Sequence, residues 1–240
     1  MTRTRMRILW LFAVASAIAV SAGTCAGTVT LKTDDQAAVK KRYEGKQLFL
    51  RSSMYYGPFF GDRKTHLLAT RAFDELRLIE GLDGVPIPPG KEEGIVPAGR
   101  EVLVEKIEFP PAERPLLTPR FYPWVYLKVD KTFTDRPHIL VLQLGGDTLA
   151  EFEQLVAVYL VEKDPRPAID ARPQPVREAI DAKKVVEGMT EDDLTGALGM
   201  PDSVRRLQDK DGRTDLWSYP KRCVTVKEGK TVSSADGTCK

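Results

Sequence analysis

The chain has few of the side chains that most often perform enzymatic chemistry. It contains two histidines, His66 and His138, and three cysteines among 240 residues. A hydrolytic triad needs a histidine beside a serine or cysteine nucleophile and an acid, and the nearby Ser52 and Ser53 do not lie in a G-x-S-x-G motif. A zinc site needs histidines and cysteines at short spacings, which this sequence lacks. We therefore expect no catalytic residue, no metal site and no cofactor.

Motifs that bind phosphate or nucleic acid are also absent. Gly145 and Gly146 stand between an apolar strand pattern over 139–144 and a helical pattern, but neither G-x-x-x-x-G-K-[ST] nor G-x-G-x-x-G occurs there. The chain has 36 basic and 34 acidic residues, and three of the arginines lie within the first 26 residues. The remaining 33 basic residues form no stripe of the kind that contacts nucleic acid. We expect no nucleic-acid partner.

No apolar run is long enough to cross a bilayer comfortably. The run over 8–20 has 13 residues, whereas a spanning helix needs about 20. Arg3, Arg5 and Arg7 precede this run and small residues follow it, a pattern typical of a secretory signal peptide. We expect residues 1–26 to direct export to the periplasm or to the periplasmic face of the outer membrane. Two processing routes stay open, namely cleavage that leaves a soluble protein, or attachment of a lipid to Cys25.

A proline-rich segment divides the exported part of the chain. Residues 164–175 contain four prolines, and this density of proline favours an extended, semi-rigid backbone. The segment is therefore predicted to be a linker between a first domain over 36–163 and a second domain over 176–240. Each domain is long enough to bury its own core, and the expected overall class is α+β.

The first domain is expected to be rich in β-structure. Residues 47–50, 101–109 and 121–129 are rich in apolar, β-branched or aromatic side chains, and turn residues crowd 86–99. These features predict a small antiparallel barrel, and the Pro-Ala-Gly turn before the second of these strands is weakly similar to SH3-like barrels. Residues 69–79 fit either a helix or an irregular strand, and both alternatives stay open.

One long helix is expected to end this domain. Asp147 is placed to cap its first turn. Apolar residues then recur on one face at Leu149, Phe152, Val156, Tyr159 and Leu160.

Aromatic rings gather around a Gly-Pro pair in the first domain. An aromatic surface flanked by proline can bind a peptide or a glycan, so this segment is the candidate binding surface. Its members are Tyr55, Tyr56, Phe59 and Phe60.

The second domain contains a short helix whose two ends are specified. Thr190 suits the N-cap, and Asp193 is placed to complete a capping box. Gly199 suits a left-handed C-cap, and Pro201 prevents the helix from continuing.

A weaker helical pattern precedes this helix, and strand patterns follow it. Residues 203–208 and 214–219 flank an Asp-Gly turn, and residues 223–226 and 231–233 flank a Glu-Gly-Lys turn. The expected order is helix, helix, then an antiparallel meander. The weaker helical face consists of Ala179, Ile180, Lys183 and Val186.

The order of these features resembles a known family. Gly188-Met189-Thr190 is followed by Leu198-Gly199-Met200-Pro201 and by Trp217-Ser218-Tyr219. This succession over 176–240 resembles the BamE (SmpA/OmlA) domain of small bacterial outer-membrane lipoproteins, and more broadly the β-lactamase-inhibitor-like fold. The resemblance implies a small ααβββ domain, and it adds weight to lipidation of Cys25. The matched residues report fold better than activity.

Together these features point to a non-enzymatic protein of the cell envelope. We expect an adaptor that binds other envelope proteins, and the BamE resemblance implies a role in outer-membrane assembly or integrity. The alternative is an inhibitor or a module that binds peptidoglycan or peptides, because the same fold class includes enzyme inhibitors and the first domain is weakly SH3-like.

A disulfide is expected between Cys223 and Cys239. Cys25 is either removed with the signal peptide or consumed by a lipid, which leaves two cysteines in an oxidising compartment. A turn near 228–229 pairs Cys223 with a residue around Ser234, so Cys239 has to curl back from the end of the chain. Two free thiols are the alternative.

Overall fold

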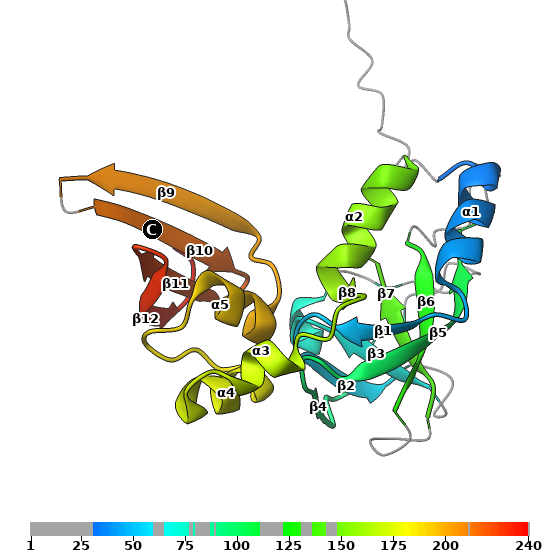
Figure 1. The fold of residues 1–240 in the computed structure, drawn as a ribbon, viewed down its shortest axis with the longest axis horizontal. Helices are drawn as coiled ribbons and strands as arrows, with labels where there is room; N and C mark the ends of the chain where they lie inside the picture. The colour runs from blue at the N-terminus through cyan, green and yellow to red at the C-terminus, as the bar shows by residue number, and fades with distance from the viewer. Residues whose placement is uncertain are drawn as a thin grey trace, which may run out of the picture.

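The computed structural model describes residues 31–59, 65–76, 79, 87–88, 90–110, 122–130, 136–142, 148–210 and 212–239. These residues form two lobes, each with helices packed on a sheet (Figure 1). The expected α+β class is confirmed. The predicted signal peptide over 1–26, with its candidate lipidation site Cys25, lies outside the described residues, and so does Phe60.

The N-terminal lobe is built on one eight-stranded sheet that curls into a half-barrel. Its strand order is β4-β2-β3-β7-β6-β5-β1-β8, and β3 pairs with β7 in parallel. The expected small antiparallel, SH3-like barrel is therefore wrong, because the sheet is open and mixed. Turn residues mark where strands end, whereas strand order depends on pairing between distant segments. The strands are β1 (Gln47–Leu50), β2 (Met54–Pro58), β3 (His66–Ala69), β4 (Gly94–Val96), β5 (Glu101–Glu108), β6 (Trp124–Val129), β7 (His138–Val141) and β8 (Leu160–Val161).

Helices α1 (Thr33–Tyr43) and α2 (Leu149–Tyr159) cover one face of this sheet (Figure 1). The sequence pattern did not predict α1, because Val39 and Tyr43 are its only buried side chains. The predicted long helix is α2, but its N-cap is Thr148, since the Thr148 hydroxyl accepts the backbone N–H of Glu151 at 3.2 Å. The expected cap Asp147 lies outside the described residues.

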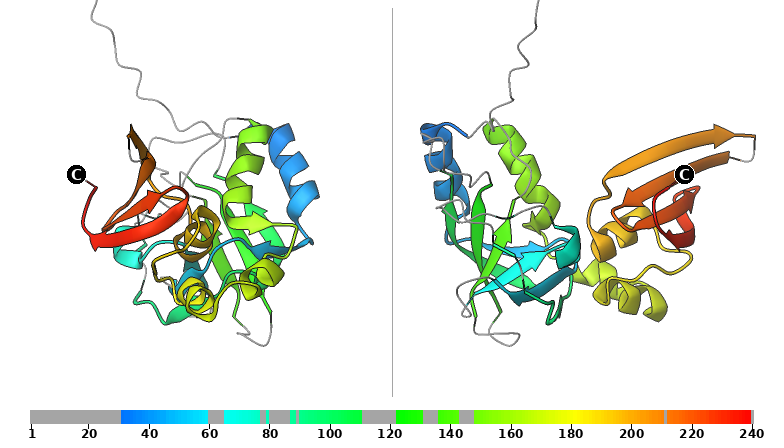
Figure 2. Two further views of the ribbon diagram at one scale, coloured as in Figure 1. Left: turned by 60° about the vertical axis from the view of Figure 1, so that its left-hand side comes forward. Right: turned by 180° about the vertical axis from the view of Figure 1, so that it is seen from behind.

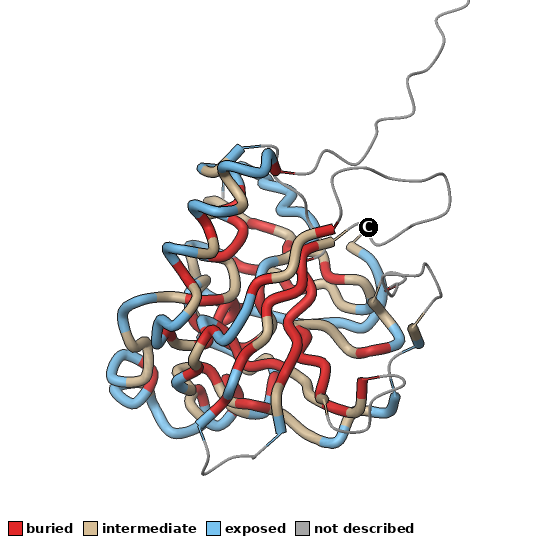
Figure 3. The backbone as a smooth tube through the Cα atoms, turned by 90° about the vertical axis from the view of Figure 1, so that its right-hand side faces the viewer, coloured by how far each residue is buried: buried red, intermediate tan, exposed pale blue. Residues whose placement is uncertain are grey.

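The two middle strands of the sheet are buried on both faces. Every residue of β3 and of β7 is buried, which is typical of a parallel pair covered on both sides, and Figure 3 shows the buried runs through the sheet. Leu68 and Leu140 join the core under α1 and α2, whereas Leu67 and Ile139 join a second core on the opposite face. The segment over 69–79, whose structure the sequence left open, contains the end of β3 and a 3₁₀ turn at Phe73–Glu75.

The proline-rich segment between the lobes is helical. It contains α3 (Arg166–Asp170) and the start of α4 (Gln174–Asp181), so the expected extended backbone is wrong. Pro165 and Pro173 occupy the N-cap positions of these helices, and a further proline lies in each first turn. The first N–H groups of a helix have no intrahelical acceptor, so proline is tolerated there.

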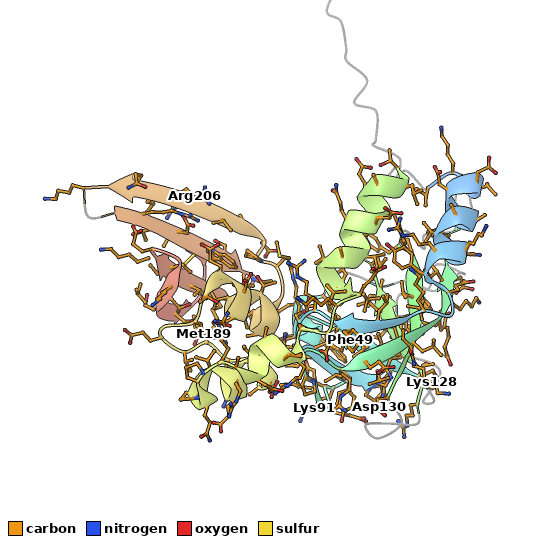
Figure 4. The ribbon with its side chains drawn as sticks, viewed as in Figure 1. Phe49, Lys91, Lys128, Asp130, Met189 and Arg206 are labelled. Atoms are coloured by element: carbon orange, nitrogen blue, oxygen red, sulfur yellow. A yellow bond between two sulfur atoms is a disulfide. The ribbon has the colours of Figure 1, made fainter. Side chains whose placement is uncertain are left out.

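The C-terminal lobe packs α4 and α5 (Glu191–Leu198) against a four-stranded antiparallel sheet of order β12-β11-β10-β9. Trp217 and Tyr219 are buried on the face that meets the helices, and so is Met189, which Figure 4 labels. The four strand segments predicted from the sequence are confirmed, whereas the ααβββ order that the BamE resemblance implies has one strand too few. In Figure 2 the β9–β10 hairpin extends past the helices. The strands are β9 (Ser203–Asp209), β10 (Gly212–Tyr219), β11 (Arg222–Lys227) and β12 (Lys230–Asp236).

Helix α5 has the predicted N-terminal capping box. The Thr190 hydroxyl accepts the Asp193 N–H at 3.2 Å, and the Asp193 carboxylate accepts the Thr190 N–H at 2.9 Å. The left-handed C-cap is corrected, because Gly199 has φ 80° and ψ −167°, a mirror-extended conformation open almost only to glycine. A Cβ at Gly199 would lie 3.0 Å from the Cβ of Thr70, so this glycine also permits close contact between the lobes.

The structure joins Cys223 and Cys239 in a disulfide, as predicted. Their Cα atoms are 5.0 Å apart, within the usual range for a bridge. The return of the chain begins at Gly237, which has a positive φ of 102° and donates its N–H to the Lys221 carbonyl at 2.8 Å. The bridge fixes the last residues of the chain to β11.

Replacing Thr190 with alanine should lower the free energy of unfolding by about 1 kcal/mol, because the Asp193 N–H loses its acceptor. Urea unfolding measures the change. Thr190→Ser keeps the hydroxyl and serves as the control. Equal losses in the two variants would contradict the capping role.

Removing the disulfide should cost about 3 kcal/mol, because the unfolded chain regains the freedom that the closed loop takes from it. The test is urea unfolding of a Cys223→Ala, Cys239→Ala double variant beside the wild type, each with and without reductant. Reductant should destabilise only the wild type. If the wild type keeps the same free energy of unfolding after both thiols have been fully reduced, the bridge does not stabilise the fold.

Candidate functional site

A cleft of about 1080 Å³ lies between the two lobes. Strand β2 and the 3₁₀ turn line it from the N-terminal lobe, and the α4–α5 connection and the β10–β11 turn line it from the C-terminal lobe. The side chains that matter for its chemistry are Tyr55, Phe73, Glu92, Lys183, Tyr219 and Arg222.

Lys183 lies at the boundary between the lobes and is only 4% exposed. Its ammonium group donates to the backbone carbonyl of Ser53 at 2.7 Å and to that of Ala197 at 2.9 Å. The ammonium also lies 5.1 Å from the centre of the Tyr55 ring, within the range of a cation–π contact. One side chain therefore contacts both lobes, and its backbone has an unusual positive φ of 54°.

Ser53, from the N-terminal lobe, makes further hydrogen bonds at this boundary. We call the contacts of Ser53 and Lys183 between the lobes the joint. The Ser53 N–H donates to the carbonyl of Gly196 at 2.8 Å, and its hydroxyl donates to the carbonyl of Ile180 at 2.7 Å. The same hydroxyl accepts the N–H of Ala98 at 3.0 Å. The hydroxyl of Ser53 is thus engaged as both donor and acceptor, which favours a structural role over a nucleophilic one.

The joint caps two helix ends at once. Ile180 lies in the last turn of α4, and Gly196 and Ala197 lie in the last turn of α5. Carbonyls in a last turn lack intrahelical donors, and the negative end of the helix dipole favours a cation. Ser53 and Lys183 supply the donors and the positive charge that these ends need.

Burial shifts the pKa values of three side chains that line the cleft, namely Lys183, Tyr55 and Tyr219. Burial, helped by the charge of Arg222 and opposed by Glu75, lowers the pKa of Lys183 to about 7. Burial also raises the pKa of Tyr55 and of Tyr219, which keeps both phenols neutral. The Tyr219 hydroxyl donates to the carbonyl of Gly199 at 3.3 Å.

Most charged side chains at the cleft rim are paired. Arg71 forms an ion pair with Asp202, and Lys221 forms one with Asp74, so two more contacts link the lobes. The Glu92 carboxylate accepts the N–H of Phe73 at 2.7 Å.

The structure divides the predicted aromatic surface. Tyr55 lines the cleft, but Tyr56 packs against the rings of His66 and His138. Phe59 is 3% exposed and packs edge-on against Trp124 with ring centres 5.2 Å apart, so its assignment to a surface is wrong. Successive side chains of a strand point to opposite faces, which explains why neighbouring rings separate. Phe60 lies outside the described residues.

Sequence patterns missed Lys183 and Arg222. Lys183 stands at helical spacing from Ala179 and Ile180, on the apolar face of the weaker helical pattern. A lysine on an apolar face was the one signal in the sequence that pointed to a buried cation. Arg222 carries no comparable signal, because it resembles any other charged residue at a strand end.

The two histidines lie together outside the cleft. They are register partners on β3 and β7 with ring centres 5.2 Å apart, and both are buried. Burial, together with the smaller effect of the neighbouring His66, lowers the pKa of His138 to about 4. Burial also lowers the pKa of His66, although Glu93 lies 3.3 Å from its Nε2 atom and opposes the shift. Both rings are therefore neutral at pH 7, and they pack as part of the core.

Comparison with protein-family models, curated proteins and solved structures finds no match for this chain. Within the described part of the chain, no group of three His, Cys, Asp or Glu side chains has the geometry to hold a metal ion. The same residues contain no helix with the length and apolar character needed to cross a membrane.

The stability of the folded chain should rise with pH through Lys183. Its pKa is about 7 in the folded chain, against an ordinary value of 10.5. The unfolded chain binds more protons across this window, so the free energy of unfolding increases as pH rises. Lys183→Met should remove a slope of up to about 1.4 kcal/mol per pH unit.

Urea unfolding from about pH 7 to about pH 9 tests this slope, because the Lys183 term is active over that range. The matched control is Lys184→Met, since Lys184 is the exposed neighbour. The control should keep the wild-type slope. A Lys183→Met variant with the same slope as wild type would show that Lys183 does not titrate in this window.

Proposed function

We propose that this chain is an exported, non-enzymatic adaptor of the cell envelope that binds a segment of another protein in the cleft between its lobes. The observation that carries the proposal is the cleft itself, which the partly exposed Tyr55 ring lines from the N-terminal lobe. Phe73 and Tyr219 also line it, but they are buried in the cores of the lobes. Tyrosine rings provide much of the binding energy in protein interfaces, because they bury a large area and lose little freedom.

The joint between the lobes favours binding in this cleft. Ser53 and Lys183 fix the two walls through buried hydrogen bonds. Walls that are already ordered lose little entropy when a partner binds, so more of the contact energy contributes to affinity.

The polar groups near the cleft favour recognition over catalysis. The Ser53 hydroxyl is held by Ile180 and Ala98, and the Tyr219 hydroxyl donates to Gly199. The histidine pair lies in the core of the N-terminal lobe. A general base needs a reachable proton and a nucleophile needs an open approach. The two hydroxyls are occupied by structural contacts, and both histidines are buried.

The envelope location rests on two supports. The disulfide is consistent with folding in an oxidising compartment, and the first 26 residues have the pattern of an export signal. The BamE resemblance over 176–240 favours a role in outer-membrane assembly or integrity, at the periplasmic face of the outer membrane if Cys25 is lipidated.

A photo-crosslinking phenylalanine at Tyr55 should capture one envelope protein in cells of the native host, because this ring faces the cleft. The same group at Lys128, on strand β6 away from the cleft (Figure 4), is the positional control. Adducts are identified by mass spectrometry, and Tyr55→Ser should abolish co-purification of the identified partner while Tyr55→Phe retains it.

The outcomes separate the candidate functions. An adduct with a β-barrel assembly component supports the adaptor role. Retention of the chain on peptidoglycan, lost in Tyr55→Ser, supports the peptidoglycan-binding alternative instead. Equal crosslinking from Tyr55 and Lys128 would refute the cleft as the binding site.

A further inference from the structure

Arg222 stands apart from the other cations that line the cleft. Arg71 and Lys221 are paired across the lobes, and Lys183 is held by two carbonyls. The side chain of Arg222, which begins β11, makes no ion pair or hydrogen bond with any residue that the structure describes. Its register partner on β12 is Asp236, which lines the same cleft without pairing to it.

Arg222 lines the cleft with Lys183, Tyr55 and Tyr219, which come from both lobes. Its charge helps burial to lower the pKa of Lys183, and it opposes the larger effect of burial, which raises the pKa of both tyrosines. A guanidinium with no partner among the described residues therefore lies in a cleft that both lobes line.

We infer that Arg222 binds a carboxylate of the partner segment, and that Lys183, which lines the same cleft, adds positive charge when its amino group is protonated. This inference rests on the proposed function and names the chemistry that its cleft recognises. A guanidinium offers two parallel N–H donors that match the two oxygens of a carboxylate. Two of the three donors of the Lys183 ammonium group are already directed at Ser53 and Ala197, so the direct bonds to the carboxylate are assigned to Arg222.

The rest of the lining favours a single carboxylate over a more highly charged anion. Cations and carboxylates balance around the cleft, so a polyanion would meet repulsion at its edges. An apolar side chain next to the carboxylate has a place against Phe73 and Leu198. The ligand class is therefore a peptide with one free carboxylate beside an apolar residue. The balanced lining consists of Arg71, Lys183, Lys221 and Arg222 against Asp74, Glu75, Glu92 and Asp236.

The test compares two pools of N-acetylated pentapeptides that end in Leu or Phe, one pool with a free terminal carboxylate and one with a terminal amide. Calorimetry with the mature full chain should show saturable binding of the acid pool, with the amide pool about tenfold weaker or more, because the guanidinium loses a charge-assisted partner. Arg222→Gln should weaken binding of the acid pool by a similar factor.

Lys227→Gln is the matched control, because Lys227 is an exposed cation on the same strand that does not line the cleft. This variant should bind like wild type. Arg222→Lys, which keeps the charge but loses the two parallel donors, should fall between wild type and Arg222→Gln. It also keeps the test valid if Arg222→Gln folds poorly, which a thermal melt would reveal.

Several outcomes would overturn the inference. The first is equal binding of the acid and amide pools. The second is wild-type affinity in both Arg222→Gln and Arg222→Lys, and the third is no binding of either pool. Displacement of the acid pool by inorganic phosphate at equal concentration would indicate a general anion site and would also overturn it. The proposed function fails separately, because it depends on crosslinking at Tyr55 and not on the terminal carboxylate.

Discussion

The buried ammonium group of Lys183 is the contact on which the arrangement of the two lobes depends. Taking a charge out of water costs several kcal/mol unless its donors are satisfied. Lys183 meets that condition only where the Ser53 carbonyl of one lobe and the Ala197 carbonyl of the other come together. Separating the lobes would leave the Ser53 carbonyl without its Lys183 donor, and it would leave the Ile180 and Gly196 carbonyls without the donors that Ser53 supplies. The hydrogen bonds thus specify one relative position of the lobes, and apolar contact alone would be less directional.

Close backbone contact around this joint explains several features of the sequence. Gly99 has φ 78°, and a Cβ there would lie 2.9 Å from the Cβ of Arg166. Gly199 meets Thr70 in the same way on the other side. Arg166 in turn pairs with Asp181 at 2.7 Å, which ties α3 to the end of α4. The proline-rich segment therefore works as a packed helical connection, and the cleft walls it joins keep a fixed spacing.

Features that depend on residues close in sequence could be predicted, whereas contacts between distant segments could not. The capping box at Thr190, the strand at 47–50 and the pairing of Cys223 with Cys239 each follow from residues close in sequence or from simple counting. The parallel pairing of β3 with β7 joins segments about 70 residues apart along the chain, and no local pattern encodes such a pairing. The same limit applies to the site, because Tyr55, Lys183 and Arg222 come from three separate regions. The extended backbone predicted for the proline-rich segment was wrong for a different reason. Proline is tolerated in the first turn of a helix but disrupts its interior, and the count of prolines does not show which position they occupy.

The polar groups in and near the cleft differ in whether they already have hydrogen-bond partners within the protein. The Ser53 and Tyr219 hydroxyls donate to backbone carbonyls, and so do two of the three donors of a protonated Lys183. Arg222 has no such contact, and a guanidinium stays protonated at any physiological pH. It can orient a carboxylate but cannot act as a base. The observed contacts therefore give Ser53, Lys183 and Tyr219 structural roles and leave the Arg222 side chain without a partner among the residues that the structure describes.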